Sequence, residues 1–148
     1  MPDVRADSAV LLVAQGPSGL VVVRAGADGS IQQTSGSLLY DSQGNQLIPQ
    51  FASISVSSAG DSQLVAAVAN KRIRVINYAL MANGTVNVKF RGGADDKTGL
   101  LYLVANAGVA PGEARYGHFQ TGLGQALNIN LSAAIAVGGH LTYVAVGE

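Results

Sequence analysis

The sequence has no cysteine and no tryptophan, and only 12% of its 148 residues are charged. Without cysteine the chain forms neither disulfides nor cysteine-bound zinc sites, which fits folding in a reducing cytoplasm. Nine basic and nine acidic residues cancel, so the chain lacks the net field that attracts nucleic acid or an anionic membrane surface. We therefore expect neither nucleic acid nor a membrane as a partner.

Long apolar runs are also missing. No stretch approaches the ~18 consecutive apolar residues typical of a membrane-spanning helix. The first apolar run, Ala9–Ala14, is short and follows acidic residues, which is not typical of a signal peptide. The sequence thus predicts a protein made in the cytoplasm, and if the protein leaves the cell we expect another route, such as lysis.

The chain is rich in small and apolar residues, with 19 glycines and a hydrophobic share of 48%. So little charge beside so much apolar surface indicates that other copies or partners cover part of the molecule. Short runs of Val, Ile and Leu alternate with clusters of Gly, Asn, Asp and Ser, which is the pattern of a strand-rich protein.

The pattern predicts two parts. Residues 1–50 have weak strands and long turns, and we expect them to form an N-terminal arm or small β-subdomain. Within it, Val10–Ala14 and Leu20–Arg24 predict a hairpin over the turn Gly16–Gly19. Residues 51–148 carry stronger strand signals, and we expect a β-sandwich there.

Eight strands are expected in the second part: Ala52–Ser58, Ser62–Val68, Arg72–Ala82, Thr85–Phe90, Leu100–Ala105, Tyr116–Gln120, Leu127–Ser132 and His140–Val146. They predict an all-β fold, an antiparallel sandwich of the jelly-roll type. An immunoglobulin-like sandwich is the main rival, but the chain lacks the Trp and the Cys pair that would support it. By apolar spacing, Ser62–Arg72 could instead form a short helix.

The stretch NYALMANGTVNVKF predicts a hairpin over Asn83-Gly84. A three-residue loop sets Leu80 opposite Val88 and Tyr78 opposite Phe90, which keeps the core side apolar.

Within the following strand, Val86 and Val88 point inward with Phe90. The preceding strand changes phase at Val75-Ile76, so that Ile76 would join the face of Tyr78, and this predicts a β-bulge. The same strand is apolar on both faces, so we expect a second layer or another subunit to cover it.

Few residues could carry chemistry, and we find no catalytic, cofactor or metal motif. His118 and His140 could be catalytic bases, although packed or surface histidines explain them as well. Asp95-Asp96 could offer oxygens to calcium, but the D-x-D-x-D-G spacing is absent, which favours a solvated loop.

Lys71, Arg72 and Arg74 form a basic cluster near Tyr78. Together they could bind single-stranded nucleic acid. The alternative is that charge at the start of a strand discourages aggregation.

The segment from about Arg72 to Val146 resembles a family of small structural proteins of tailed bacteriophages and prophages. The resemblance rests on RIRVINYALMANGTVNVKF, GGADDKTGLLYLVANAGV and GHFQTGLGQALNINLSAAIAVGGHLTYV. It implies a virion component with a jelly-roll-like fold and no enzymatic activity. Its partners would be two further copies in a homotrimer and the major capsid protein, and it would lie on the capsid surface as a decoration or cement protein.

A flexible arm could add strands to a capsomer or to a neighbouring protomer. The candidate residues for binding the capsid or another subunit are Val10, Leu11, Leu12, Val13, Leu20, Val21, Val22, Val23 and Arg24.

The rival hypothesis is a tail-fibre or receptor-binding domain that attaches to a host-surface glycan. Tyr116 is the best candidate there for stacking on a sugar ring. A polysaccharide-cleaving enzyme would need paired carboxylates, and the loops of the second part offer only Asp95, Asp96 and Glu113 apart from the terminal Glu148.

Overall fold

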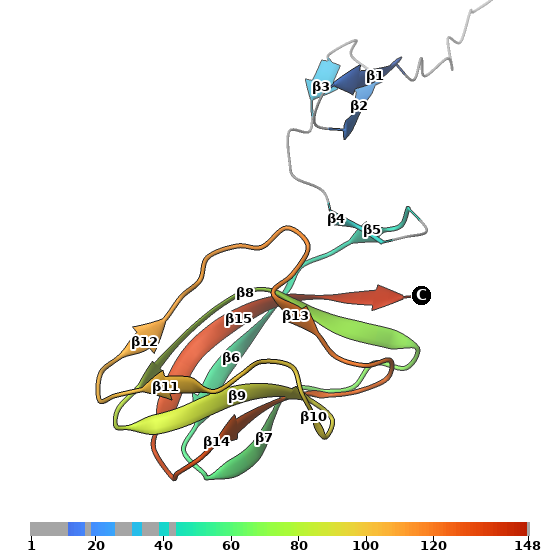
Figure 1. The fold of residues 1–148 in the computed structure, drawn as a ribbon. Helices are drawn as coiled ribbons and strands as arrows, with labels where there is room; N and C mark the ends of the chain where they lie inside the picture. Colours follow the sequence, from blue (N-terminus) through green and yellow to red (C-terminus); the bar gives the residue numbers. More distant parts are fainter. Residues whose placement is uncertain (1–11, 17–18, 26–30, 34–38, 42–43, 148) are drawn as a thin grey trace, which may run out of the picture. The chain divides into compact units, whose positions relative to one another are not determined.

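The computed structural model describes residues 12–16, 19–25, 31–33, 39–41 and 44–147. The chain divides into two compact units, Met1–Ser37 and Leu38–Glu148. The sequence predicts the division after Gln50, whereas the short strands β4 (Leu39–Tyr40) and β5 (Gln46–Leu47) belong to the second unit. Figure 1 traces the strands of both units.

The first unit contains a three-stranded antiparallel sheet in the order β1-β2-β3. Its strands are β1 (Leu12–Gly16), β2 (Gly19–Ala25) and β3 (Ile31–Gln33). Pairing of β1 with β2 runs from Gly16 opposite Gly19 to Leu12 opposite Val23, which confirms the predicted hairpin. Val10 and Leu11, the first two candidate binding residues, lie outside the described residues.

The second unit is a sandwich of two antiparallel sheets (Figure 1). One, which we call the β9 sheet, has the order β10-β9-β14-β7, with β11 also on β9. The other, the β8 sheet, has the order β12-β8-β15-β6, with β13 also on β8. The strands are β6 (Gln50–Val56), β7 (Gly60–Val65), β8 (Lys71–Ala82), β9 (Val86–Gly92), β10 (Asp95–Asp96), β11 (Leu101–Leu103), β12 (Gly108–Val109), β13 (Phe119–Gln120), β14 (Leu127–Leu131) and β15 (Val137–Gly147).

The expected all-β antiparallel sandwich is therefore confirmed, and no helix occurs among the described residues. In that part of the chain, accordingly, no helix is long and apolar enough to cross a membrane. The helix considered for Ser62–Arg72 is wrong. Strand β7 ends at Val65, and Lys71 N donates to the carbonyl of Val68 across a turn in which Asn70 has a φ of 56°.

The core lies between the inner faces of the two sheets and follows strict alternation along β9. Val86, Val88 and Phe90 are buried, as predicted, while Asn87 and Lys89 are partly exposed. Alternation of this kind places every second residue of a strand on one face of its sheet. The same pattern buries alternate residues of β14.

The predicted hairpin over Asn83-Gly84 is wrong, because β8 and β9 lie in different sheets. The chain crosses between the sheets at this turn, where Asn83 N donates to the carbonyl of Ala136 at 2.9 Å. Tyr78 and Phe90 do meet, with ring centroids 5.1 Å apart, but across the sandwich rather than along a ladder. The expected faces were right because alternation sets them whether or not the two strands pair.

The predicted bulge at Val75-Ile76 is confirmed. Thr142 pairs with Asn77 and Tyr143 with Val75, so that Ile76 has no partner in the register. The prediction that Ile76 joins the face of Tyr78 is wrong. Ile76 turns to the outer side of the sheet and belongs to a different core cluster from Tyr78.

A small second core covers β8 from outside at Ile76. There Ile76 packs with Val144 and Val146 of β15 and with Leu47 of β5. The second layer that the sequence predicts is supplied here by the hairpin β4–β5 of the same chain. Further along β8, Met81 is 59% exposed.

Close approach of backbones makes Gly139 of β15 intolerant of a side chain. An added Cβ would lie 2.0 Å from the carbonyl oxygen of Ala79 on β8. We predict that Gly139→Ala lowers the free energy of unfolding by about 2–3 kcal/mol or more.

Gly138 is the matched control, since its added Cβ would come no closer than 3.9 Å to the carbonyl oxygen of Ile54. Gly138→Ala should change stability by less than about 0.5 kcal/mol. Denaturant unfolding measures both variants, and equal destabilisation would contradict the proposed contact.

Candidate functional site

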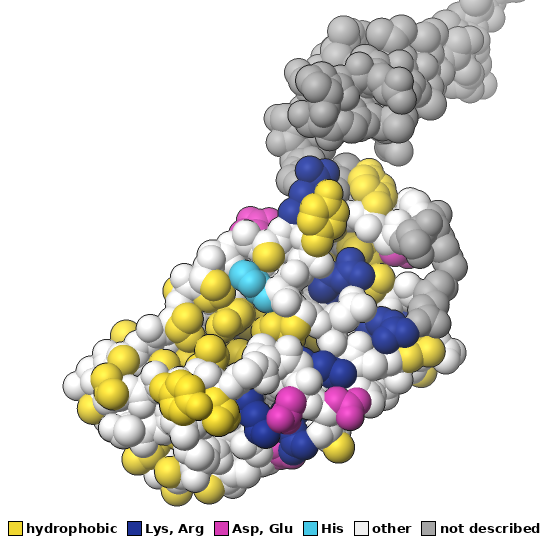
Figure 2. Space-filling model, viewed as in Figure 1, with side chains coloured by type: hydrophobic (Ala, Val, Ile, Leu, Met, Phe, Trp, Pro, Cys, Tyr) yellow, Lys and Arg dark blue, Asp and Glu magenta, His cyan; other side chains and the backbone are white. Residues whose placement is uncertain are grey.

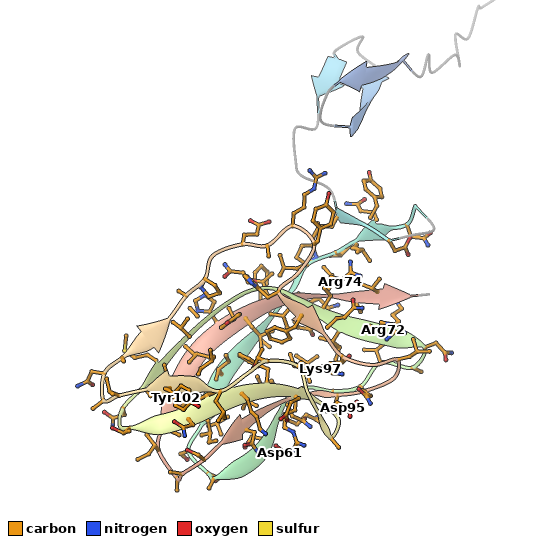
Figure 3. All side chains as sticks on the ribbon, viewed as in Figure 1. Asp61, Arg72, Arg74, Asp95, Lys97 and Tyr102 are labelled. Carbon is orange, nitrogen blue, oxygen red and sulfur yellow. The ribbon has the colours of Figure 1, made fainter. Side chains whose placement is uncertain are left out.

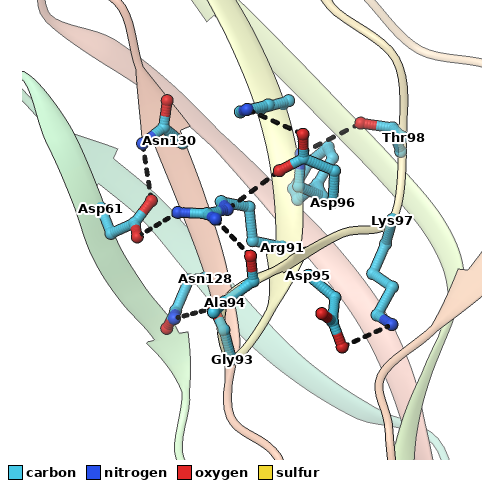
Figure 4. A network of polar contacts seen from close by, with 12 residues as sticks. Asp61, Arg91, Gly93, Ala94, Asp95, Asp96, Lys97, Thr98, Asn128 and Asn130 are labelled. Carbon is cyan, nitrogen blue, oxygen red and sulfur yellow. Dashed lines mark hydrogen bonds and ion pairs between the residues drawn. The ribbon is translucent and has the colours of Figure 1, made fainter.

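The outer faces of the two sheets differ sharply in charge. On the β9 sheet, Arg91 forms ion pairs with Asp61 of β7 at 2.6 Å and with Asp96 of β10 at 2.9 Å, and Lys89 pairs with Asp96 at 2.8 Å. Figure 4 shows the network, and Figure 2 shows positive and negative side chains gathered together on the surface there. Two cations and two carboxylates cancel, so this face is charged but locally neutral.

Side-chain amides extend the network along β14. Asn130 Nδ2 donates to Asp61 Oδ1 at 2.6 Å, and Asn128 Nδ2 donates to the carbonyl of Gly93 at 3.3 Å. All these residues are at least partly exposed, so each ion pair contributes little to stability. This face is therefore solvated, and its ion pairs connect Asp96 of β10 to Lys89 and Arg91 of β9.

The calcium hypothesis for Asp95-Asp96 has no support from this geometry. The Asp96 carboxylate already accepts from Lys89 and Arg91, and Asp95 lies 3.7 Å from the ammonium of Lys97. Within the described ranges, no group of three or more His, Asp or Glu side chains could hold a metal ion. Both acids thus already have positively charged partners within the same chain.

The outer face of the β8 sheet has a stretch without any Asp, Glu, Lys or Arg. Nine residues from three neighbouring strands form it in three rows, and we call it the uncharged face. The rows across β6, β15 and β8 are Phe51, Thr142 and Asn77; Ser53, His140 and Ala79; and Ser55, Gly138 and Met81.

Large apolar side chains stand at opposite corners of the uncharged face. Phe51 is 79% exposed and Met81 is 59% exposed, whereas most positions between them carry small side chains. A flat, uncharged surface with exposed large apolar residues is typical of a contact surface, because charged residues are depleted at the centres of interfaces.

The strand at the border of this face, β6, is also an edge strand. It pairs with β15 on one side and, among the described strands, with none on the other. Its sequence, QFASISV, contains no charge and no proline. Natural edge strands carry such residues to prevent pairing with other chains, so β6 is open to association.

A shallow groove of about 430 Å³ lies at the end of the uncharged face. It shares Ser55, Met81 and Gly138 with that face and adds Asn83 and Asn106 from neighbouring turns. The groove therefore extends the contact surface toward the loops.

A second hollow, of about 190 Å³, lies where β4–β5 meets the loop between β12 and β13. It brings Tyr116, the candidate for stacking on a sugar, beside Tyr40, Arg74 and Arg115. The two tyrosines are 83% and 51% exposed. We call this hollow the Tyr–Arg pocket. The sequence drew attention to Tyr116 alone, because its partners come from distant segments.

The structure separates the two histidines from each other. His118 Nε2 lies 2.9 Å from the carbonyl oxygen of Gly112, and its ring packs edge-on to Tyr78 at 5.5 Å. His140 lies in the middle row of the uncharged face, between Ser53 and Ala79. No acidic side chain occurs in this face, so nothing there would orient His140 as a catalytic base.

Arg72 and Arg74 of the basic cluster lie on the outer face of β8, but Tyr78 does not join them there. Tyr78 points into the core, where burial raises the pKa of its hydroxyl, so its ring is not available to stack on a base. Arg74 Nε donates to Gln120 Oε1 at 3.0 Å, and Figure 3 shows Arg72 and Arg74 on β8. This arrangement gives no support to a single-strand binding surface.

The candidate binding residues of the hairpin all fall in β1 and β2, apart from Val10 and Leu11. Leu12 and Val13 pair with Val23 and Val22, and Leu20 and Val21 pair with Gln15 and Ala14. Arg24 pairs with Gln32 of β3. The hairpin thus has one strand, β1, at an edge of its sheet.

Comparisons with known proteins found no matching protein family, no matching curated protein and no matching solved structure.

The Asp96 carboxylate offers a direct test of the charged face. The hydrogen bond from Lys89 has the largest effect on the pKa of Asp96 and, together with the positive charges of Lys89 and Arg91, holds this pKa below its ordinary value of 3.8, although desolvation opposes the shift. Stabilisation from a lowered pKa is present above the unfolded-state value and is lost as pH falls through the folded-state value. We predict that Lys89→Met raises the pKa of Asp96 toward 3.8.

Carbon-13 NMR titration of the side-chain carboxyl measures this pKa. Lys97→Met is the matched control, because Lys97 pairs with Asp95 and not with Asp96. The network as described would be wrong if the pKa of Asp96 stayed the same in Lys89→Met or rose equally in Lys97→Met.

Proposed function

We propose that the chain is a structural protein of a tailed-bacteriophage particle. In this proposal it forms a homotrimer that binds the outer surface of the capsid, contacts the major capsid protein and stabilises the head. Its activity is attachment, and no chemical step is involved. The single observation that carries the proposal is the uncharged face on the β8 sheet, in contrast to the network of ion pairs on the outer face of the β9 sheet.

The uncharged face supports contact with a second copy of the same chain. A surface without Asp, Glu, Lys or Arg can meet a different patch of a neighbouring copy without charge repulsion, and a cyclic trimer requires such a contact between two different patches. The open edge of β6 borders this face, and Phe51 supplies a large apolar side chain at the border. Contacts between two different patches close into a ring of identical subunits when the rotation between neighbours allows it.

The N-terminal unit supplies the proposed contact with the capsid. It forms a compact unit separate from the sandwich, and β1 lies at the edge of its sheet. An edge strand can add to an exposed sheet of another protein by main-chain hydrogen bonds. Three such contacts on one trimer would strengthen attachment by multivalency, even if each were weak.

We further propose that the sandwich has jelly-roll connectivity, as the resemblance to small phage proteins implies. Consecutive long strands alternate between the sheets: β6 and β8 lie in one, β7 and β9 in the other. The last two long strands return beside the first, with β14 next to β7 and β15 next to β6. This order supports the resemblance, although fold alone does not establish function.

A second candidate function is that of a tail-fibre or receptor-binding domain that attaches to a host-surface glycan. The Tyr–Arg pocket is the observation that favours it, because exposed aromatic rings beside a small hollow suit a sugar ring. Head and tail locations give different results in the microscopy described below.

The contact between copies predicts the effect of a charge placed at the centre of the uncharged face. Ser53→Arg introduces a buried, unpaired cation at each interface, which costs far more than a surface charge. We expect the trimer to dissociate to monomers in light scattering coupled to size-exclusion chromatography. Gln63→Arg, on the exposed face of β7, is the matched control and should remain a trimer. A trimeric Ser53→Arg protein would rule out this face as the interface.

Deletion of residues 1–37 tests the role of the N-terminal unit. The deletion leaves β4–β5 intact, so Leu47 still covers Ile76. We predict that the shortened chain remains folded and trimeric but no longer co-sediments with capsids that lack the protein. Undiminished capsid binding would show that attachment does not use this unit.

Immunogold labelling of virions with antibody against the recombinant protein tests the location. Gold spread over the head is the expected result. Gold confined to the tail would favour the second candidate function, and unlabelled particles, with the protein present in infected cells, would contradict both.

A further inference from the structure

We propose that the Tyr–Arg pocket binds a carboxylated sugar, such as a hexuronate unit of a surface polysaccharide. The inference deepens the second candidate function by naming its ligand class and rests on that function. It does not depend on the proposed contact with the capsid. All the residues involved belong to the sandwich unit.

The floor of the pocket is apolar and built from the second core. Leu39, Leu47, Ile76 and Val144 line it, and the last three are buried. Ile76 reaches this place only because of the bulge in β8, which turns its side chain to the outer face. A fixed apolar floor suits the C–H side of a sugar ring and excludes water from beneath it.

Two guanidinium groups supply positive charge at the wall. Arg74 is half-buried, and the hydrogen bond from its Nε to Gln120 Oε1 at 3.0 Å fixes its side chain. Within the described part of the chain, Arg115 forms no hydrogen bond and no ion pair. The planar fork of a guanidinium matches a carboxylate through two parallel hydrogen bonds.

Asp41, which follows Tyr40, is not among the residues that line the pocket, and its carboxylate accepts from the backbone N and the Nδ2 of Asn45 at 2.8 and 3.0 Å. The residues that line the pocket include two cations and no acid. The pocket therefore favours an anionic ligand.

Tyr40 and Tyr116 complete the pocket at its rim. The rings of these tyrosines leave apolar surface in contact with water, and a bound ligand would cover it. Their hydroxyl groups can form hydrogen bonds with a polar ligand at the same time. The volume of about 190 Å³ is below the roughly 300–1,000 Å³ of sites that enclose drug-sized ligands. A hollow of this size suits a single sugar ring.

Two arginines, two tyrosines and an apolar floor thus select a single ring with a carboxylate. Inorganic phosphate would use the arginines but neither the floor nor the tyrosines. A neutral hexose would use the floor and the tyrosines but leave the arginines without an anion. The three probes glucuronate, glucose and phosphate separate these contributions.

The test is a titration of the full chain with each probe, followed by nitrogen-15 and carbon-13 NMR. We expect glucuronate to shift resonances of Tyr40, Arg74, Arg115 and Tyr116 and to bind at least about fivefold more tightly than glucose or phosphate, since a hydrogen bond to a charged group is worth 1.5–3 kcal/mol. Equal binding of phosphate would reduce the pocket to an anion site and overturn the proposal. Absence of shifts with glucuronate would overturn it as well.

Variants assign the contacts. Arg115→Gln should weaken glucuronate binding about tenfold, and Arg115→Lys should recover only part of the loss because lysine lacks the planar fork. Tyr116→Ala should weaken binding of glucuronate and glucose alike. Tyr102→Ala is the matched control, since Tyr102 is 75% exposed on β11, and it should bind as the wild type does. An equal loss in Tyr102→Ala would contradict the assignment.

The outcomes separate the inference from the function on which it rests. If glucose bound as tightly as glucuronate, the pocket would still attach to a glycan, but the choice of a carboxylated sugar would be wrong. If no sugar bound, the second candidate function would lose its supporting observation, while the proposed trimer and its capsid contact would be unaffected.

Discussion

The contact between Tyr78 and Phe90 across the sandwich is the interaction on which the rest of the structure depends. Their ring centroids are 5.1 Å apart, and Phe119 packs on Phe90 at 4.9 Å. The two residues belong to β8 and β9, each of which has partner strands on both sides in its sheet. Once the inner faces of these strands are fixed by the rings, alternation determines which residues every neighbouring strand presents outward.

The outer faces that result have opposite characters. Alternation along β9 places Lys89 and Arg91 outside, where they pair with Asp61 and Asp96. Alternation along β8 places Ala79 and Met81 outside beyond the bulge, and the bulge itself turns Ile76 outward beneath β5. The outer side of this sheet thus has two parts. At one end the hairpin β4–β5 of the same chain covers it and forms the Tyr–Arg pocket, and at the other end it is the exposed uncharged face. We propose that the pocket binds a ligand and that the uncharged surface joins copies of the chain.

Much of this could be predicted from local sequence. The period-two pattern of TVNVKF identified the buried face of β9, and the phase change in RIRVINYALMA located the bulge. The partners of the strands could not be predicted, because Asn83-Gly84 suits a hairpin and also a crossing between sheets, and only long-range packing distinguishes the two. The uncharged face and the Tyr–Arg pocket were missed for the same reason, since register between distant strands assembles them. The absence of charge in QFASISV indicated one uncharged strand, but it did not show which strands lie beside it in the sheet.

The most direct test of the central claim, that the uncharged face joins copies of the chain, is hydrogen–deuterium exchange over a series of dilutions. We expect the β6 amides to be protected at high concentration and to lose protection on dilution, as the copies separate. The amides of β7, the corresponding edge of the charged sheet, should exchange at the same rate throughout. Exchange at β6 that is independent of concentration, or protection that changes at β7 instead, would show that the uncharged face does not join copies of the chain.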